Sequence, residues 1–371
     1  MSAGQLVPRP LRRGALAAAL ALCIVTPAHA APDARAARLY EDALVRFERQ
    51  DHKGAIIQLK NALQIDRRML PVQVLLGRAL LADGQVAAAE VAFLEALDLG
   101  VNRAEIVLPM IEAALLQGQH RKVLDESRFA AAGLPRPLQA QVHLQHATAA
   151  ADLGEPRQAL KLIEQARAID ASSPDSWLAE ATVLLRVRQF DRAAAAVDKA
   201  MERAPGSAVV LHHVAQLRHL QGDLKGALDA YDRTLAVQPA HVESLVARAG
   251  LLIDLDRGSD AQATLARLRE AAPDDPREAY LSALLAERAG KTDEARAALK
   301  RVTALIDPVP IAYIRYRPQM LMLNGLAHVG LGEREAAKPY LEAYQRLDPG
   351  GGASKLLAQV LLAEGKFELA I

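Results

Sequence analysis

The stretch that decides the fold runs from residue 211 to residue 239 and reads LHHVAQLRHLQGDLKGALDAYDRTLAVQP. Its marker residues are Ala215, Gly222, Ala227, Tyr231 and Pro239. Gly222 separates two apolar-periodic segments, because glycine accepts the backbone conformation that a tight turn after a helix needs. Pro239 ends the second segment, since proline cannot continue a helix. The stretch therefore predicts two helices joined by a turn.

The same spacing recurs along the whole chain. The alanine near the start of each second helix recurs as Ala55, Ala89, Ala159, Ala193, Ala227, Ala261, Ala295 and Ala337, with Val123 in a degenerate third copy. Successive steps are 34 residues, except for one of 36 and one of 42. Five residues earlier, glycine recurs as Gly84, Gly118, Gly154, Gly222, Gly290 and Gly332. Prolines close several units at Pro205, Pro239, Pro273 and Pro349.

A 34-residue helix-turn-helix unit with these positions resembles the tetratricopeptide repeat. The composition agrees, because 51% apolar but only 4% aromatic residues suit thin layers of helices that cross closely at alanine. One unit cannot bury its apolar stripe alone, so neighbouring units must stack. We therefore expect an all-α, right-handed superhelical solenoid over residues 31–371. It comprises nine repeats over 36–349 and an incomplete tenth over 351–371.

Two places break the period. Residues 133–137 add two residues between the third and fourth units, and residues 307–314 add eight between the eighth and ninth. The second insertion carries Tyr313, followed by Arg315 and Tyr316. We expect a longer loop with a packed ring there; the alternative is a local bend or a partner contact.

The amino terminus has the pattern of an export signal. Residues 1–13 are basic, an apolar run of eleven residues follows from Ala15 to Val25, and Ala28 and Ala30 give a small-x-small cleavage pattern. We expect cleavage after Ala30 and a periplasmic mature chain; an uncleaved anchor is the alternative. The only cysteine is Cys23, and the leucine before it argues against a lipid anchor. No later segment is long and apolar enough to span a membrane.

The charge balance argues against nucleic acid as a partner. Without residues 1–30 the chain keeps 42 basic and 44 acidic residues, so it offers no broad basic surface to phosphate backbones.

No catalytic constellation stands out, so we expect neither an enzyme nor a cofactor. Gly290-Lys291-Thr292 lacks the preceding glycine of a phosphate-binding loop, and residues 254–260 lack the distal glutamate of a calcium loop. The histidine groups His143/His146 and His212/His213/His219 lack the converging ligands that zinc needs. We expect no metal; a metal-dependent enzyme is the weakest alternative.

Repeat stacks of this kind usually bind peptides on the surface that the first helix of each unit lines. The positions that the repeat assigns to this surface give the candidate binding residues Tyr40, Phe47, Arg78, Arg186, His212, Gln216, His219, Tyr280 and Arg288. The arginine-histidine-tyrosine strip of units five to eight is the preferred patch.

Residues 36–125 carry a closer resemblance. Tyr40-Glu41-Asp42-Ala43-Leu44, Gly54 through Gln64 and Leu75 through Leu81 resemble the exported tetratricopeptide-repeat protein of exosortase/PEP-CTERM systems. That resemblance implies an envelope scaffold linked to exopolysaccharide production and PEP-CTERM protein export or sorting, with proteins or peptides of that machinery as partners. Those proteins continue with further repeats. We therefore expect that this chain is truncated or that another chain covers its end. Direct polysaccharide binding is the alternative function.

Overall fold

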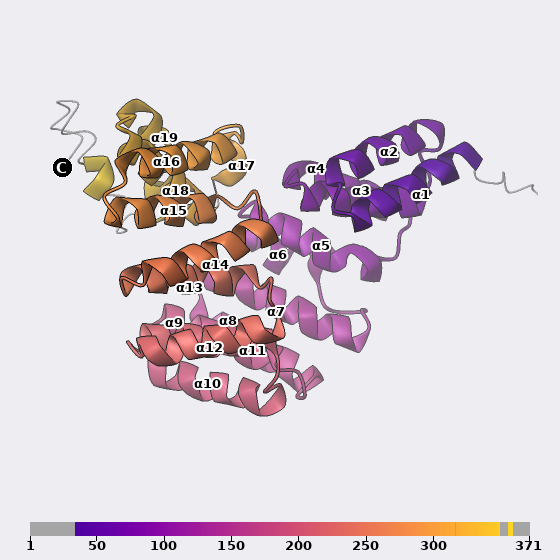
Figure 1. Cartoon of the computed structure of the whole chain (residues 1–371). Helices are drawn as coiled ribbons and strands as arrows, with labels where there is room; N and C mark the ends of the chain where they lie inside the picture. Colours follow the sequence, from indigo (N-terminus) through magenta and orange to yellow (C-terminus); the bar gives the residue numbers. More distant parts are fainter. Residues whose placement is uncertain (1–33, 316, 349–354, 359–371) are drawn as a thin grey trace, which may run out of the picture.

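The computed structural model describes residues 34–315, 317–348 and 355–358 (Figure 1). Throughout these ranges the regular structure is helical, and eighteen helices form nine antiparallel pairs. The first helices are α1 (Ala34–Glu48), α3 (Leu70–Ala82), α5 (Arg103–Leu116), α7 (Arg136–Asp152), α9 (Asp175–Arg186), α11 (Ala208–Leu220), α13 (Val242–Asp254), α15 (Pro276–Arg288) and α18 (Pro318–Leu331). The second helices are α2 (His52–Ile65), α4 (Val86–Asp98), α6 (His120–Asp125), α8 (Pro156–Ile169), α10 (Phe190–Arg203), α12 (Leu224–Val237), α14 (Gly258–Ala271), α16 (Thr292–Ile306) and α19 (Arg334–Leu347).

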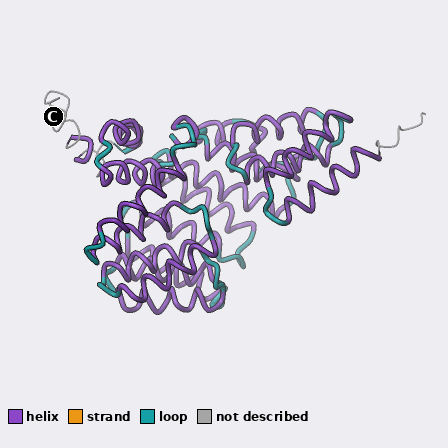
Figure 2. Tube along the Cα trace, turned by 45° about the horizontal axis from the view of Figure 1, so that its top comes forward, coloured by secondary structure: helices purple, strands orange, loops and turns teal. Residues whose placement is uncertain are grey.

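The pairs stack in chain order and form a solenoid. Figure 2 shows helices joined by short loops along the whole described trace. Apart from the degenerate third pair, each pair packs most closely within itself and then on the next pair, so the interior is a series of cores along the stack instead of one deep core. The expected all-α repeat solenoid is confirmed.

The turn within each unit depends on one left-handed residue. The position five residues before the marker alanine has a positive φ in all nine units. Glycine fills it six times, while Gln50, Arg188 and Asp256 adopt φ of 62°, 59° and 55° in the other three. Glycine has no Cβ to clash in this conformation, which explains its recurrence there.

The marker alanines lie where the two helices of a unit cross. Each is the fourth residue of its helix, and all eight are buried, with at most 3% of their surface exposed. Val123 takes the same place in the third unit and is fully buried. Pro205, Pro239 and Pro273 each stand two residues after the end of a second helix, as expected; Pro349 lies outside the described residues.

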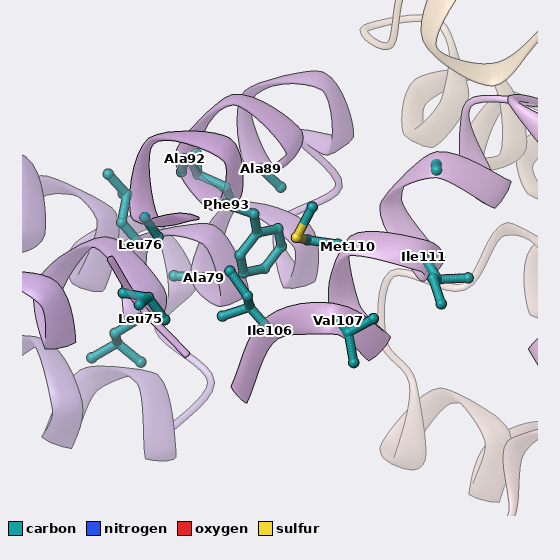
Figure 3. Packing of buried hydrophobic residues seen from close by; sticks show 14 of the residues in the cluster. Leu75, Leu76, Ala79, Ala89, Ala92, Phe93, Ile106, Val107, Met110 and Ile111 are labelled. Atoms are coloured by element: carbon teal, nitrogen blue, oxygen red, sulfur yellow. The ribbon is translucent and has the colours of Figure 1, made fainter. Parts of the chain in front are cut away.

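The core of the first units shows how closely the helices approach. Phe93 of α4 is fully buried and points toward Ile106 and Met110 of α5 (Figure 3). A Cβ built on Gly77 of α3 would lie 2.4 Å from the Phe93 ring. Glycine at residue 77 is therefore required by this close approach.

The third unit is the degenerate one. Its second helix, α6, has only six residues and is followed by a short 3-10 helix, η1 (Ser127–Phe129). The guanidinium of Arg103 donates to the carbonyl oxygens of Ala130 and Ala132 at 2.5 and 2.6 Å and so holds the irregular segment. Phe129 fills the space beside it and is 1% exposed.

The insertion before the ninth unit forms the short helix α17 (Ile311–Ile314). Ile314 is buried, whereas Tyr313 is 61% exposed. Tyr313 is therefore not a packed ring, and the buried apolar contact of α17 comes from Ile314. Tyr316 lies outside the described residues.

Ion pairs link neighbouring units at equivalent positions. Arg186 pairs with Asp152 at 2.5 Å, and Arg288 pairs with Asp254 at 3.2 Å; each pair is 34 residues apart. The guanidinium of Arg277 meets both carboxylate oxygens of Glu243, again 34 residues away, at 2.8 and 2.9 Å.

The single tryptophan lies at the centre of the stack. Trp177 of α9 contacts two arginines: the Arg167 guanidinium is 3.5 Å from its ring centroid and that of Arg203 is 4.9 Å away. Such cation–π contacts stabilise the junction between the fourth and fifth units.

Both ends of the chain lie largely outside the described residues. The expected export signal over residues 1–30 falls there, as does most of the expected incomplete tenth repeat. Leu357 is buried against Ala337 and Leu341 of α19.

Replacing Gly222 with alanine isolates the cost of the left-handed turn. A Cβ on Gly222 would meet no atom within 4 Å, so the penalty is purely conformational. We expect Gly222→Ala to lower the free energy of unfolding by about 1–2 kcal/mol, measured by urea denaturation.

Gly206 provides the matched control. It also has open space around its Cβ position, but its φ is not in the left-handed range. Gly206→Ala should change stability by less than about 0.5 kcal/mol. Equal losses in the two variants would show that backbone conformation is not the cause.

Candidate functional site

The main candidate site is a groove of about 890 Å³ lined chiefly by first helices. We call it the A-helix groove. Its lining residues are His212 and Gln216 of α11, Glu243, Val246 and Ala247 of α13, Asp275, Pro276 and Arg277 at the start of α15, Pro318, Gln319, Met320, Met322, Leu323 and Leu326 of α18, and Tyr344 of α19. It therefore runs across the sixth to ninth units.

A second hollow of about 390 Å³ extends the groove toward the fifth unit. It is lined by Thr182 and Arg186 of α9 and by His219 of α11, among others. Gln216 and Ala247 line both hollows, so the two are adjoining parts of one surface. The surface spans five consecutive units, which suits an elongated ligand better than a compact one.

The two walls of the A-helix groove differ in chemistry. The α18 wall is apolar and half-buried, with Met320, Met322, Leu323 and Leu326. Methionine side chains are flexible and polarisable, so such a wall adapts to different apolar partners. The charged wall, formed by Glu243, Asp275 and Arg277, holds its charges in fixed positions.

Arg277 organises the charged wall. Besides its two bonds to Glu243, its guanidinium donates to Asp275 at 2.7 Å. Asp275 also caps α15 by accepting from the backbone N–H of Arg277. These hydrogen bonds, first of all those to Asp275, raise the pKa of Arg277. The cation is fully paired, so the wall presents a rigid polar surface rather than a free positive charge.

His212 forms part of the groove floor. It is 7% exposed, and its Nδ1 lies 2.8 Å from the Ser244 hydroxyl oxygen. The rings of His241 and Tyr231 are 5.0 and 5.9 Å away, centroid to centroid. Burial, with smaller contributions from nearby His213 and His241, lowers the pKa of His212 to about 4. The ring is therefore neutral at neutral pH.

Four candidate residues meet on this surface: Arg186, His212, Gln216 and His219. The other five line neither hollow. Tyr40 and Phe47 pack against the core of the first units, and the Arg78 guanidinium donates to the Glu105 carbonyl at 3.1 Å.

The preferred strip is interrupted at the eighth unit. Tyr280 packs against the core beside α16 and α18, and burial raises its pKa. Arg288 bonds to Asp254 and Asp256 of the previous unit. Arg186 and Arg288 of the strip thus form ion pairs that join neighbouring units.

Sequence reasoning missed the apolar wall and the charged wall. The eight-residue insertion shifts the ninth unit out of register, so the repeat positions did not single out α18. Glu243 and Arg277 carried a usable signal, because they are opposite charges at the same place in consecutive units.

Outside the groove, His146 has a backbone partner. His146 is buried, its Nε2 is 3.0 Å from the Phe129 carbonyl oxygen, and burial lowers its pKa. Across residues 34–348, apart from residue 316, and 355–358, no three His, Cys, Asp or Glu side chains group as metal ligands would. No helix in the same ranges is long and apolar enough to cross a membrane.

Family models of the tetratricopeptide repeat match the chain in several places. One matches residues 219–287, and another matches 144–208, 178–241 and 322–371. Together they cover more than half of the chain. The chain is a tetratricopeptide-repeat protein. No curated protein matches this repeat protein in sequence.

Solved structures agree with the fold of this tetratricopeptide-repeat protein. The Cut9–Hcn1 heterotetramer of the APC/C has a chain of 15% identity that aligns with a TM-score of 0.51, over 91% of this chain and 71% of that one. PilW, a type IV pilus biogenesis factor, is 21% identical, with a TM-score of 0.45, and the alignment covers 60% of this chain and 98% of PilW. Yeast Tom70 is 14% identical, with a TM-score of 0.45, and the alignment covers 92% of this chain and 91% of Tom70. Repeat folds of this family are typically non-catalytic scaffolds.

The lowered pKa of His212 predicts a pH-dependent stability. Between about pH 6.5 and about pH 4 the unfolded chain binds a proton at His212 and the folded protein does not, so unfolding becomes easier as the pH falls. The part of the free energy of unfolding that depends on neutral His212 is fully present above about pH 6.5 and is lost by about pH 4. It is on the order of 1–3 kcal/mol. Urea denaturation at a series of pH values measures it.

His213 and His146 have pKa values lowered by burial as well, so His212→Gln should reduce the pH dependence without abolishing it. The same change at His219, on the same helix, is the control. An unchanged pH dependence in His212→Gln would contradict the assignment.

Proposed function

We propose that this protein is a non-enzymatic scaffold of the bacterial envelope. In this proposal the A-helix groove holds a segment of a partner protein. The scaffold serves exopolysaccharide production and the export or sorting of PEP-CTERM proteins. The observation that carries the proposal is the groove itself, which combines an apolar wall on α18 with a fixed polar wall around Arg277.

The groove favours a short segment of a partner over a broad flat interface. A volume of about 890 Å³ accommodates several side chains, and the lining combines apolar surface with polar groups already held in position. A wall that is already ordered spares the partner part of the entropy cost of binding. An apolar segment facing α18, with polar groups facing Glu243 and Arg277, fits both walls.

The envelope location and the biological process rest on the first part of the sequence. Residues 1–30 have the basic, apolar and small-residue regions of an export signal. Residues 36–125 carry the resemblance to the exported repeat protein of exosortase systems. These two features support the finer proposal, whereas the groove supports the scaffold role.

A photo-reactive amino acid placed at Gln216 tests the groove directly. Gln216 lines both hollows, so a bound segment must pass within reach of it. We expect irradiation in the native host to give one discrete cross-linked product. Leu326→Glu should reduce its yield by about tenfold or more, because the new charge must be desolvated against the partner.

Val237→Glu is the matched control, because Val237 is an exposed apolar residue at the end of α12 and lies outside the groove. It should leave the product unchanged. A product that survives Leu326→Glu would place the partner elsewhere, and no product at all would count against the scaffold.

The export signal predicts a defined mature terminus. Protein isolated from the periplasmic fraction of the host should begin at Ala31, because cleavage is expected after Ala30. Mass spectrometry of the intact chain gives this directly. A chain that retains Met1 and stays in the cytoplasmic fraction would overturn the envelope location without affecting the groove.

One observation favours polysaccharide binding as a second candidate. The exposed Tyr313 of α17 lines a hollow of about 450 Å³ together with the inter-helix turns at Gly84 and Gly118 and with Gln117 and Lys122. In Figure 1, α17 lies on the side of the later units that faces α4. An aromatic ring with amide and ammonium neighbours suits a sugar ring. Titration with the purified host polymer, comparing the parent with Tyr313→Ala, tests it; equal binding would remove this candidate.

A further inference from the structure

A second kind of pocket lies on the side of the stack formed by the second helices. It has a volume of about 570 Å³ and lies between α14, α15 and α16 of the seventh and eighth units. Its apolar lining includes Leu265, Ala279, Leu285 and Ala286, while Arg269 and Arg301 contribute the guanidinium groups. None of these residues lines the A-helix groove.

A buried carboxylate lies beside these two arginines. Glu278 has no exposed surface, and its Oε1 accepts from Arg269 at 2.6 Å and from the Ser282 hydroxyl at 2.9 Å. Its Oε2 lies 2.8 Å from Nη1 of Arg301, an ion pair whose angles do not make it a hydrogen bond. One carboxylate is thus shared between two cations.

This carboxylate is unusual among the units. The equivalent position, seventeen residues before the marker alanine, is Val72, Val142 and Val210 in other units, and each of these valines is buried. The fold therefore does not require an acid at this position. Removing a carboxylate from water is unfavourable unless cations compensate for it, and the two arginines do so here.

The charges around the pocket do not cancel. Lys291 pairs with Glu294 at 3.0 Å, so those two lining charges balance. Glu278 balances only one of Arg269 and Arg301. One positive charge remains next to an apolar lining, and the Arg269 side chain is 54% exposed, so part of it can still meet a ligand. Arg301 also uses Nη2 to donate to the Pro273 carbonyl oxygen, which fixes its orientation.

We propose that this pocket is a binding site for a carboxylate carried on an apolar group. The carboxylate would accept hydrogen bonds from Arg269 and Arg301, and its apolar part would lie over Leu265, Leu285 and Ala286. A guanidinium presents several N–H groups in one plane, which matches the two oxygens of a carboxylate. The inference goes beyond the scaffold role and uses a different surface.

Titration of the full chain with hexanoate, followed through alanine methyl signals in NMR spectra, tests the site. We expect the signals of Ala266, Ala279, Ala286 and Ala297 to shift with hexanoate but not with hexanamide, which has the same shape and no charge. N-acetylleucine and N-acetylleucinamide form a second pair. Preferential binding of the former identifies a peptide carboxylate as the source, whereas preferential binding of hexanoate identifies an alkyl carboxylate.

Three variants separate a ligand site from a merely structural ion cluster. Arg269→Gln should weaken hexanoate binding by about tenfold. Glu278→Gln keeps the shape and removes the competing charge, so it should strengthen binding severalfold. Arg233→Gln is the control, because Arg233 occupies the repeat position of Arg301 two units earlier and lies outside the pocket.

Arg269→Gln and Glu278→Gln must change the affinity for hexanoate in opposite directions. Equal shifts with hexanamide, shifts confined to residues of the A-helix groove, or weaker binding by Glu278→Gln in a folded protein would each overturn the proposal. Circular dichroism of each variant shows that it is folded. Glu278→Val, which restores the residue of three other units, gives a second route should Glu278→Gln not fold.

Discussion

The close crossing of two helices at one small buried side chain is the contact on which the rest of the structure depends. In eight of the nine units this side chain is alanine at the fourth residue of the second helix. A larger residue would separate the helices, and the next unit would then meet a surface of different shape. The crossing also explains how a chain with 4% aromatic residues builds an ordered interior, because close backbone approach replaces large rings.

Repetition then sets where function can arise. Side chains that face the neighbouring unit form ion pairs with it, such as Arg186 with Asp152 and Arg288 with Asp254. Where the repeat pattern is interrupted, the side chains are not needed for these contacts between units and can take other roles. The insertion that forms α17 directly precedes α18, which presents an apolar wall, and the unusual acid at Glu278 lies between two arginines beside an open pocket. Both candidate sites are therefore departures from the repeat.

The sequence predicted the fold well because each unit repeats the same local requirements. The marker alanines, the glycine turns and the three described prolines all lie where the spacing placed them. The candidate surface was harder to predict, since it depends on how units five to nine are arranged in space. Arg186, His212, Gln216 and His219 were placed on it, whereas the α18 wall depended on a shift in register that repeat positions do not encode.

The position of Trp177 gives the molecule a local optical reporter. Its ring contacts Arg167 and Arg203 at the junction of the fourth and fifth units, and it is the only tryptophan in the chain. The helices around it, α8, α9 and α10, pack mainly within their own and the adjoining units, so fraying at either end leaves the surroundings of this indole unchanged. Its emission follows the middle of the stack, while far-ultraviolet circular dichroism sums over every helix. The separation between the two melting curves therefore measures how far the solenoid departs from a single cooperative transition.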